Sequence, residues 1–548
     1  MHLASKPKKV LLVCLTVVLH GNSFAQPSEP AFEGACNELI GMAVPGGKVE
    51  IAQYSAGAQP ADAPHCRITG KLNDRVGVDG KRYAIGFELR LPKIWNQRFY
   101  FQGGGGTDGV LRPAVGAAPA GGVLPNALAN GFAVASTDAG HLNEPGAQGS
   151  FFFGLDPQAR VDYGYNHLPV VSVAAKALIQ KLYGTEPKTS YFVGCSNGGR
   201  QGMMAAQRFP DLFDGVISGA PAYRVVEASL DAAAQTQQFA SVAPKGTDGR
   251  PNLGKAYSMA ELAVVAKGIL QSCDALDGIA DGMVNSIRSC KFDPTSVQCS
   301  TGQSANCLAP EKAAALKAAF SGARNPRGKL IYSQWPFDPG IATPLWTSWK
   351  LGPEDAMPPR ALNTTLVAGA LSHVFVTPPQ PTADLYDFVL KVDPVAALAQ
   401  TKNSTASFTE TGRHIVNADS PNLDAFTRRG GKIIFYHGMA DGIFSPTDTV
   451  NYREQLRQRY GRKAENFTRL YLVPGMGHCG GGPATDQFDA LSALVAWVED
   501  GKAPHSLTAR TGANSQWPNR SRPLCDYPKQ AVYDGKGDSE NAASFVCR

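Results

Sequence analysis

The stretch KTSYFVGCSNGGRQGMMAAQRFP, residues 188–210, joins a short apolar run to a glycine-rich turn and then to a helical pattern that Pro210 ends. The apolar run predicts a buried strand, and the pattern after the turn predicts a helix. The pentapeptide Gly194-Cys195-Ser196-Asn197-Gly198 matches G-x-S-x-G, in which a sharp strand-to-helix turn presents a serine hydroxyl above a sheet. Such a pentapeptide also occurs in ordinary tight turns, so its setting between a strand and a helix carries the interpretation.

Strand and helix patterns alternate on both sides of this stretch. Alternating or apolar runs at 83–92, 97–102, 131–138, 432–441 and 468–478 predict strands, and periodic runs at 169–184 and 488–501 predict helices. This alternation favours an α/β fold with a parallel sheet. Between 223 and 412 the periodicity weakens while Pro, Gly and Trp accumulate, which predicts an inserted second domain. We therefore expect core segments at 26–222 and 413–548 around that insertion.

Two later strand runs end in residues that could activate the serine. Asp441 ends one run and His478 ends the next, so the chain order is Ser196, Asp441, His478. A serine nucleophile needs a base, and the base needs an orienting acid, in the order that α/β-hydrolases use. The alternative makes Asp441 a turn cap and His478 a surface histidine. Asp448 and His141 also compete for these roles, and His437 is expected to line the pocket.

Attack on an ester carbonyl creates an oxyanion, which needs N–H donors. We assign the backbone N–H groups of Asn197, directly after the serine, and of Gly104 in the run Gly103–Gly106 that follows an early strand. The glycines could instead cradle a phosphate. No Lys-Ser or Lys-Thr follows them, which argues against a P-loop.

The N-terminal segment and the composition of the chain indicate where the protein acts and which partners it lacks. Residues 1–25 have the basic start, short apolar run and small-residue end of a secretory signal peptide, so we expect a secreted or periplasmic protein. The even set of ten cysteines that remains predicts disulfides. The net charge of +6 is scattered, which disfavours nucleic acid, and no apolar segment is long enough for a membrane span.

The sulfur atoms next to the proposed nucleophile and base are diagnostic. Cys195 precedes Ser196 and Cys479 follows His478, so a meeting of serine and histidine brings the two cysteines together, as a disulfide requires. With this arrangement of Cys-Ser, Asp and His-Cys, the sequence resembles the tannase and feruloyl esterase family over nearly the whole mature chain. The resemblance implies an α/β-hydrolase core with a large lid domain between nucleophile and catalytic acid.

A glycine-punctuated loop carries a second signature. Asp274, Asp277 and Asp281 offer the oxygen ligands that a hard cation prefers, although a solvated acidic turn has the same composition. The loop resembles the calcium-binding lid loop of the family, which implies a structural Ca²⁺ with carbonyl ligands from Ile279 and Met283. The expected remaining disulfides are Cys273 with Cys290, which bracket the loop, and Cys36 with Cys66, Cys299 with Cys307, and Cys525 with Cys547.

The resemblance also implies the substrate class. We expect a monomeric serine carboxylesterase that hydrolyses small esters of aromatic carboxylic acids, feruloyl or galloyl, through an acyl-enzyme. Hydrolysis of mono(2-hydroxyethyl) terephthalate is the alternative within the family; Phe444 matches a ring-contacting position of such enzymes, and Arg360 is a candidate for their lid arginine. A non-catalytic phenolic- or carbohydrate-binding protein is the alternative of another class, and acyl transfer to another alcohol stays open.

Overall fold

The computed structural model describes residues 28–57, 63–117, 126–146, 148–513 and 515–548. The expected signal peptide lies outside the described residues. Among the described helices, none has both the length and the apolar character needed to cross a bilayer.

A ten-stranded mixed sheet forms the centre of the fold, in the order β1-β2-β3-β4-β6-β5-β7-β8-β9-β10. The first four strands pair antiparallel, whereas β6, β5 and β7 to β10 run parallel to one another. The mixed sheet with its helices confirms the α/β class. The strands are β1 (Ala43–Val44), β2 (Gly47–Ser55), β3 (His65–Val76), β4 (Arg82–Pro92), β5 (Arg98–Gln102), β6 (Ala133–Thr137), β7 (Thr189–Cys195), β8 (Gly215–Gly219), β9 (Lys432–Gly438) and β10 (Thr468–Val473).

Each central strand supplies two apolar cores because its side chains alternate between the two faces of the sheet. Phe192 of β7 enters one core, and its neighbours Tyr191 and Val193 enter the other. On the first face pack α3 (His167–Tyr183), α4 (Asn197–Arg208) and α13 (Pro446–Tyr460); on the second packs α14 (Ala490–Asp500). These double-sided strands are almost wholly buried, as is usual for parallel strands.

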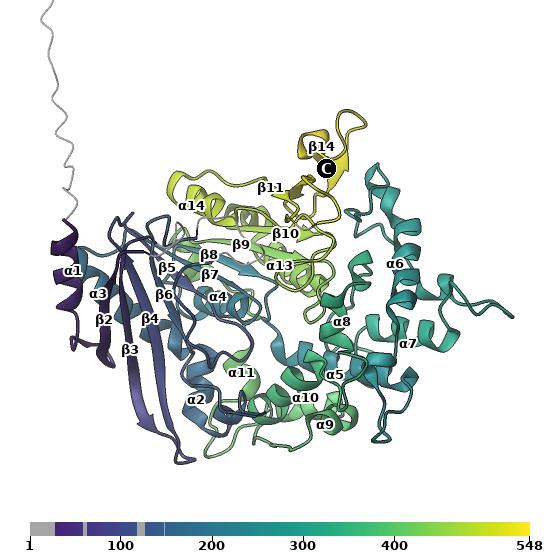
Figure 1. Cartoon of the computed structure of the whole chain (residues 1–548), viewed down its shortest axis with the longest axis horizontal. Coiled ribbons are helices and arrows are strands. Elements are labelled where there is room, and N and C mark those ends of the chain that lie inside the picture. Colours follow the sequence, from purple (N-terminus) through teal and green to yellow (C-terminus); the bar gives the residue numbers. More distant parts are fainter. Residues whose placement is uncertain (1–27, 58–62, 118–125, 147, 514) are drawn as a thin grey trace, which may run out of the picture.

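A helical insertion, residues 220–431, leaves the sheet after β8 and returns at β9. Because β8 and β9 pair directly in parallel, the sheet continues past the insertion without interruption. In Figure 1, most of the insertion helices lie together on one side of the sheet region. The insertion helices bury their apolar residues mainly in one core, which also includes Tyr163 and Phe444 from outside the insertion, whereas Phe426 near the end of the insertion packs in a core of the sheet. They are α5 (Val225–Val242), α6 (Met259–Cys273), α7 (Pro310–Phe320), α8 (Pro344–Lys350), α9 (Leu385–Lys391), α10 (Pro394–Gln400), α11 (Gly412–Val416) and α12 (Asp424–Arg428).

Short elements close both ends of the described chain. Near the N-terminus, α1 (Glu29–Asn37) packs beside β2, and Pro157–Val161 forms the short helix α2. Near the C-terminus, β11 (Ser506–Arg510) pairs with β12 (Ser521–Cys525), and β13 (Ala531–Tyr533) pairs with β14 (Phe545–Cys547).

The structure contains all five expected disulfides. The Cys195–Cys479 bond has a Cα–Cα distance of 5.9 Å and joins residues 284 positions apart. The other four close short loops: Cys36–Cys66, Cys273–Cys290, Cys299–Cys307 and Cys525–Cys547. The long-range bond fixes the end of β7 against the loop after β10.

Candidate active site

Ser196 lies at the sharp turn between β7 and α4. Its backbone has φ 64° and ψ −125°, a conformation that a residue with a side chain adopts only where the surrounding structure holds it. The flanking glycines make the turn possible, because a Cβ atom on Gly194 would lie 2.6 Å from the carbonyl carbon of Gly198. The close approach of strand and helix therefore presents the serine at the carboxyl end of the parallel strands.

His478 and Asp441 meet behind this serine. Nδ1 of His478 lies 2.7 Å from Oδ2 of Asp441, and the other oxygen of Asp441 accepts the N–H groups of Ile443 and Phe444. Burial opposes ionisation of Asp441, but the charge of His478 and hydrogen bonds from His437 and His478 hold its pKa well below the ordinary value. A buried carboxylate that stays ionised can orient an imidazole.

Ser196 and His478 line the same wide cavity, of about 610 Å³, although no hydrogen bond joins their side chains among the described residues. A narrow cavity of about 40 Å³ meets it at Ser196. The walls of the narrow cavity are mostly aromatic and aliphatic and include no charged side chain. The polar residues in them, besides Ser196, are Thr107, Asn197 and Ser229. The aromatic and aliphatic residues are Tyr163, Ala222, Val225, Trp349, Leu366, Val367, Ala370, Phe375, Ile443 and Phe444. The wide cavity carries two charged side chains, Asp108 and Arg112.

Aromatic rings enclose the histidine. The ring of Trp349, from α8 of the insertion, meets the His478 ring edge to face at 5.0 Å, and Phe444 lies 5.6 Å from it. Phe444 therefore lies at the site, as expected. Trp349 was not predicted; the accumulation of tryptophans between 335 and 349 is the only sequence signal that pointed to this region.

Two predicted pocket residues lie elsewhere. His437 is fully buried and lines neither cavity; its Nε2 lies 3.2 Å from Oδ2 of Asp441 and its Nδ1 lies 2.8 Å from Oγ1 of Thr449. His437 belongs to β9 itself, whereas Asp441 lies in the turn after that strand, so His437 contacts Asp441 on the side away from the cavity. Arg360 is exposed and lines neither cavity, so the structure does not place it beside Ser196.

The competing acid and base candidates have structural partners. Asp448 is buried and pairs with Arg224 at 2.7 Å and with the Ser333 hydroxyl at 2.6 Å. His141 is buried and stacks on Phe153 at 3.8 Å. Neither lines a cavity at Ser196.

The two expected oxyanion donors differ in their geometry. Asn197 begins α4, where helix geometry leaves its N–H without an intrahelical acceptor. The N–H of Gly104, in contrast, donates to Oε1 of Gln201 at 3.0 Å and so is not directed into the cavity. Gly104, Gly105 and Gly106 all line the wide cavity, and within the described chain the N–H groups of Gly105 and Gly106 have no acceptor. The N–H groups of Gly105 and Gly106 are therefore free to serve as oxyanion donors, whereas that of Gly104 already has an acceptor.

In the loop with Asp274, Asp277 and Asp281, the carboxylates accept hydrogen bonds from backbone N–H groups of the same segment. Asp274 accepts the N–H of Gly282 at 2.9 Å, Asp281 pairs with Arg522, and Asp277 is fully buried with only neutral partners, among them the Asn285 amide at 2.8 Å. A buried carboxylate without a cationic partner fits a cation ligand. No three acidic, histidine or cysteine side chains in the described residues gather tightly enough to hold an ion, so carbonyl oxygens would have to complete the site.

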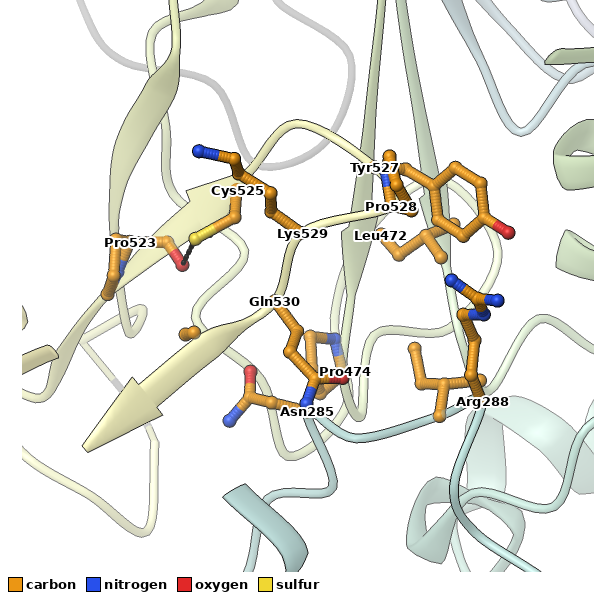
Figure 2. Close-up of a pocket in the computed structure, with 12 residues that line it drawn as sticks. Asn285, Arg288, Leu472, Pro474, Pro523, Cys525, Tyr527, Pro528, Lys529 and Gln530 are labelled. Atoms are coloured by element: carbon orange, nitrogen blue, oxygen red, sulfur yellow. Dashed lines mark hydrogen bonds between the residues drawn. The ribbon is translucent and has the colours of Figure 1, made fainter. Parts of the chain in front are cut away.

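A further pocket lies where this loop meets the C-terminal segment. Figure 2 shows it between Asn285, Pro474 and Gln530, with Arg288 and Tyr527 at one side. No Ser, His, Asp or Glu lines it, and Cys525 in its wall is disulfide-bonded. It offers neither nucleophile nor base, so the cavities at Ser196 are the candidate active site.

Known proteins resemble this chain over most of its length. Residues 66–548 match the family model described as tannase and feruloyl esterase. The chain is 41% identical to a mono(2-hydroxyethyl) terephthalate hydrolase of Piscinibacter sakaiensis, over 90% of this chain and 86% of that one. It is 29% identical to a probable feruloyl esterase of Arthroderma benhamiae, over 91% of this chain and 89% of that one.

The fold also has solved counterparts. The crystal structure of feruloyl esterase B from Aspergillus oryzae superposes with a TM-score of 0.77, at 24% identity, over 94% of this chain and all of that one. The chain therefore belongs to the tannase and feruloyl esterase family and is a carboxylic ester hydrolase.

Proposed function

We propose that the protein is an exported serine esterase that hydrolyses esters of aromatic carboxylic acids through an acyl-enzyme, and that the acyl groups it prefers carry no free carboxylate. The observation that carries the proposal is the hydrogen bond of 2.7 Å between His478 and Asp441, next to a cavity that both His478 and Ser196 line. The Cys195–Cys479 bond holds the serine and histidine segments together.

In this mechanism Ser196 Oγ attacks the ester carbonyl while Nε2 of His478 takes the hydroxyl proton. Asp441 fixes the imidazole so that Nδ1–H faces the carboxylate and Nε2 faces the serine. The N–H of Asn197 and an N–H of Gly105 or Gly106 stabilise the oxyanion. His478 then protonates the departing alkoxide, and water repeats the sequence on the acyl-enzyme to release the acid and restore the Ser196 hydroxyl.

The two cavities suggest where each half of the ester binds. The leaving oxygen must lie within reach of its general acid, His478, which lines only the wide cavity. The alcohol half therefore occupies the wide cavity, and the acyl half occupies the narrow cavity between Tyr163, Trp349 and Phe444. Aromatic walls suit a flat acyl ring.

The charge of the acyl pocket favours one substrate class over another. A free carboxylate on the acyl group would enter a space without any charged side chain in its wall, where a desolvated charge is unfavourable. Feruloyl-type esters avoid this penalty. Hydrolysis of mono(2-hydroxyethyl) terephthalate is the second candidate, because the relative with that name is 41% identical to this chain over the aligned residues.

The remaining expectations form part of the proposal. The helical insertion acts as a lid, since Trp349 reaches the His478 ring from it. Asp274, Asp277 and Asp281, with the carbonyls of Ile279 and Met283, would hold a structural Ca²⁺ that stabilises this lid. Five disulfides support export to an oxidising compartment, and the protein acts as a monomer on small ester substrates.

The test compares methyl ferulate, methyl gallate and mono(2-hydroxyethyl) terephthalate as substrates of the disulfide-intact protein. We expect the highest kcat/KM with methyl ferulate. A higher kcat/KM for the terephthalate monoester would transfer the assignment to the second candidate. Hydrolysis of none of the three, with Ser196 still labelled by a fluorophosphonate, would exclude aromatic esters and keep the serine hydrolase.

A further inference from the structure

The carboxylate of Asp108 lies where the glycine loop after β5 meets the start of α4. Asp108 is buried and only 7% exposed. One of its oxygens accepts the side-chain amide N–H of Asn197, and the other accepts Nε2–H of Gln201 at 2.8 Å. Neither Asp108 nor Gln201 has a role in the bond-making steps described above.

The hydrogen bonds around Asp108 have a fixed direction. Oδ1 of Asn197 accepts Nε–H of Arg200 at 2.7 Å, and Oε1 of Gln201 accepts the N–H of Gly104 at 3.0 Å. A guanidinium and a backbone N–H can only donate, so both amides must turn their oxygens toward these donors and their NH₂ groups toward Asp108. Two series of hydrogen bonds therefore end on the Asp108 carboxylate, one through Asn197 and one through Gln201. Both amides donate to position 108, so only a side chain with two acceptor oxygens can accept both hydrogen bonds.

This network holds the two segments that carry the oxyanion donors. Asn197 supplies one backbone N–H, and Gly104 directly precedes Gly105 and Gly106, which line the wide cavity with it. The packing is close as well, because a Cβ on Gly104 would lie 2.5 Å from Oδ2 of Asp108. We propose that Asp108, together with Gln201, is a positioning residue that fixes the glycine loop against α4 and so sets the geometry of the oxyanion donors, an inference that rests on the proposed esterase mechanism.

The surroundings of Asp108 also shift the pKa of its carboxyl group. Burial raises its pKa to about 7, against hydrogen bonds from Gln201 and Asn197 and the charges of Arg200 and Arg112. Asp138 and Tyr163 are the other titratable groups that interact with it. A protonated Asp108 would direct an O–H toward an amide NH₂, and the network would lose one of its two series of hydrogen bonds.

The test uses Asp108→Asn, which keeps the size of the side chain. The new amide NH₂ would face the NH₂ group of Asn197 or of Gln201, so one of the two hydrogen bonds to position 108 would be lost. We expect kcat to fall by about 10- to 100-fold with KM within twofold, because removal of a single oxyanion donor lowers kcat by about 100- to 1,000-fold and a displaced donor should retain part of its effect. Affinity for an arylboronic acid, which forms a tetrahedral adduct with the serine, should fall by a similar factor, while inhibition by ferulate should not change.

Asp138→Asn is the matched control, since Asp138 is also buried and accepts only backbone N–H groups, of Gly86 and Gly140, away from both cavities. It should reduce stability without the selective loss of kcat. The double variant Asp108→Asn/Gln201→Glu should restore kcat, because it exchanges the amide and the carboxylate between the two positions. The amide at position 108 would donate to the carboxylate at position 201 and accept from Asn197, while that carboxylate would still accept the N–H of Gly104.

The results separate the positioning role from the mechanism itself. Equal losses in Asp108→Asn and Asp138→Asn, or a double variant no better than Asp108→Asn, would overturn the positioning role and leave the esterase mechanism intact. A wild-type protein that a fluorophosphonate does not label at Ser196 would overturn both. If the wild type is labelled but hydrolyses no aromatic ester, the labelling rates of the same variants replace kcat as the measurement.

Discussion

The disulfide between Cys195 and Cys479 should contribute more to stability than any other in the chain, because it closes the longest loop. Its residues are 284 positions apart, against 8 for Cys299–Cys307. In the chain-entropy treatment these separations correspond to about 5–6 and about 2–3 kcal/mol of loop-closure free energy in the unfolded state. The double variant Cys195→Ala/Cys479→Ala should therefore lose about 3 kcal/mol more than Cys299→Ala/Cys307→Ala.

Urea unfolding followed by intrinsic fluorescence measures this difference, with esterase activity recorded on the same samples. The Cys195/Cys479 variant should also lose kcat before it unfolds, because the bond holds Ser196 against His478, whereas the control variant should keep its kcat. Equal losses of stability in the two variants would refute the loop-length reasoning. Unchanged kcat in the Cys195/Cys479 variant would refute the alignment role of the bond.

Three other predictions follow from the environment of the site. His437→Phe should lower kcat about tenfold with little change in KM, because the buried Asp441 carboxylate loses a partner at 3.2 Å; unchanged steady-state kinetics would contradict this. Lys350 is buried and burial lowers its pKa to about 7, so between that pH and its ordinary pKa the unfolded state binds more protons and stability rises with pH. The Tm advantage of Lys350→Met over the wild type should thus be largest below pH 7 and shrink above it, whereas a constant difference would argue against a charge penalty. Chelation with EDTA should lower Tm and leave the initial kcat of folded enzyme unchanged, and calcium should restore Tm; a Tm insensitive to EDTA would remove calcium from the account.

The sequence predicted those parts of the fold and site that local patterns encode. The apolar run before Ser196 is β7, the periodic run at 169–184 corresponds to α3 (His167–Tyr183), and the strand ends at Asp441 and His478 meet as expected. The strands β2 and β3 and the short strand β8 were missed. Strand β8 has only five residues and leads directly into the insertion, so its sequence is too short to show a clear alternation of apolar and polar residues.

Contacts between distant segments could not be predicted in the same way. Trp349 reaches His478 only through the packing of the insertion, and His437 turns away from the cavity because neighbouring residues of β9 face opposite sides of the sheet. The hydrogen bond from Gly104 to Gln201 joins residues 97 positions apart. No local pattern in the run Gly103–Gly106 shows which N–H is already hydrogen-bonded, so that distinction needed the structure.

The most direct test of the mechanism is intact-mass and peptide mapping of protein quenched in acid during turnover of methyl ferulate. The account predicts a feruloyl adduct on the peptide that contains Ser196, and neither adduct nor hydrolysis with Ser196→Ala. Hydrolysis by Ser196→Ala at the wild-type rate would contradict the assignment of Ser196 as the nucleophile.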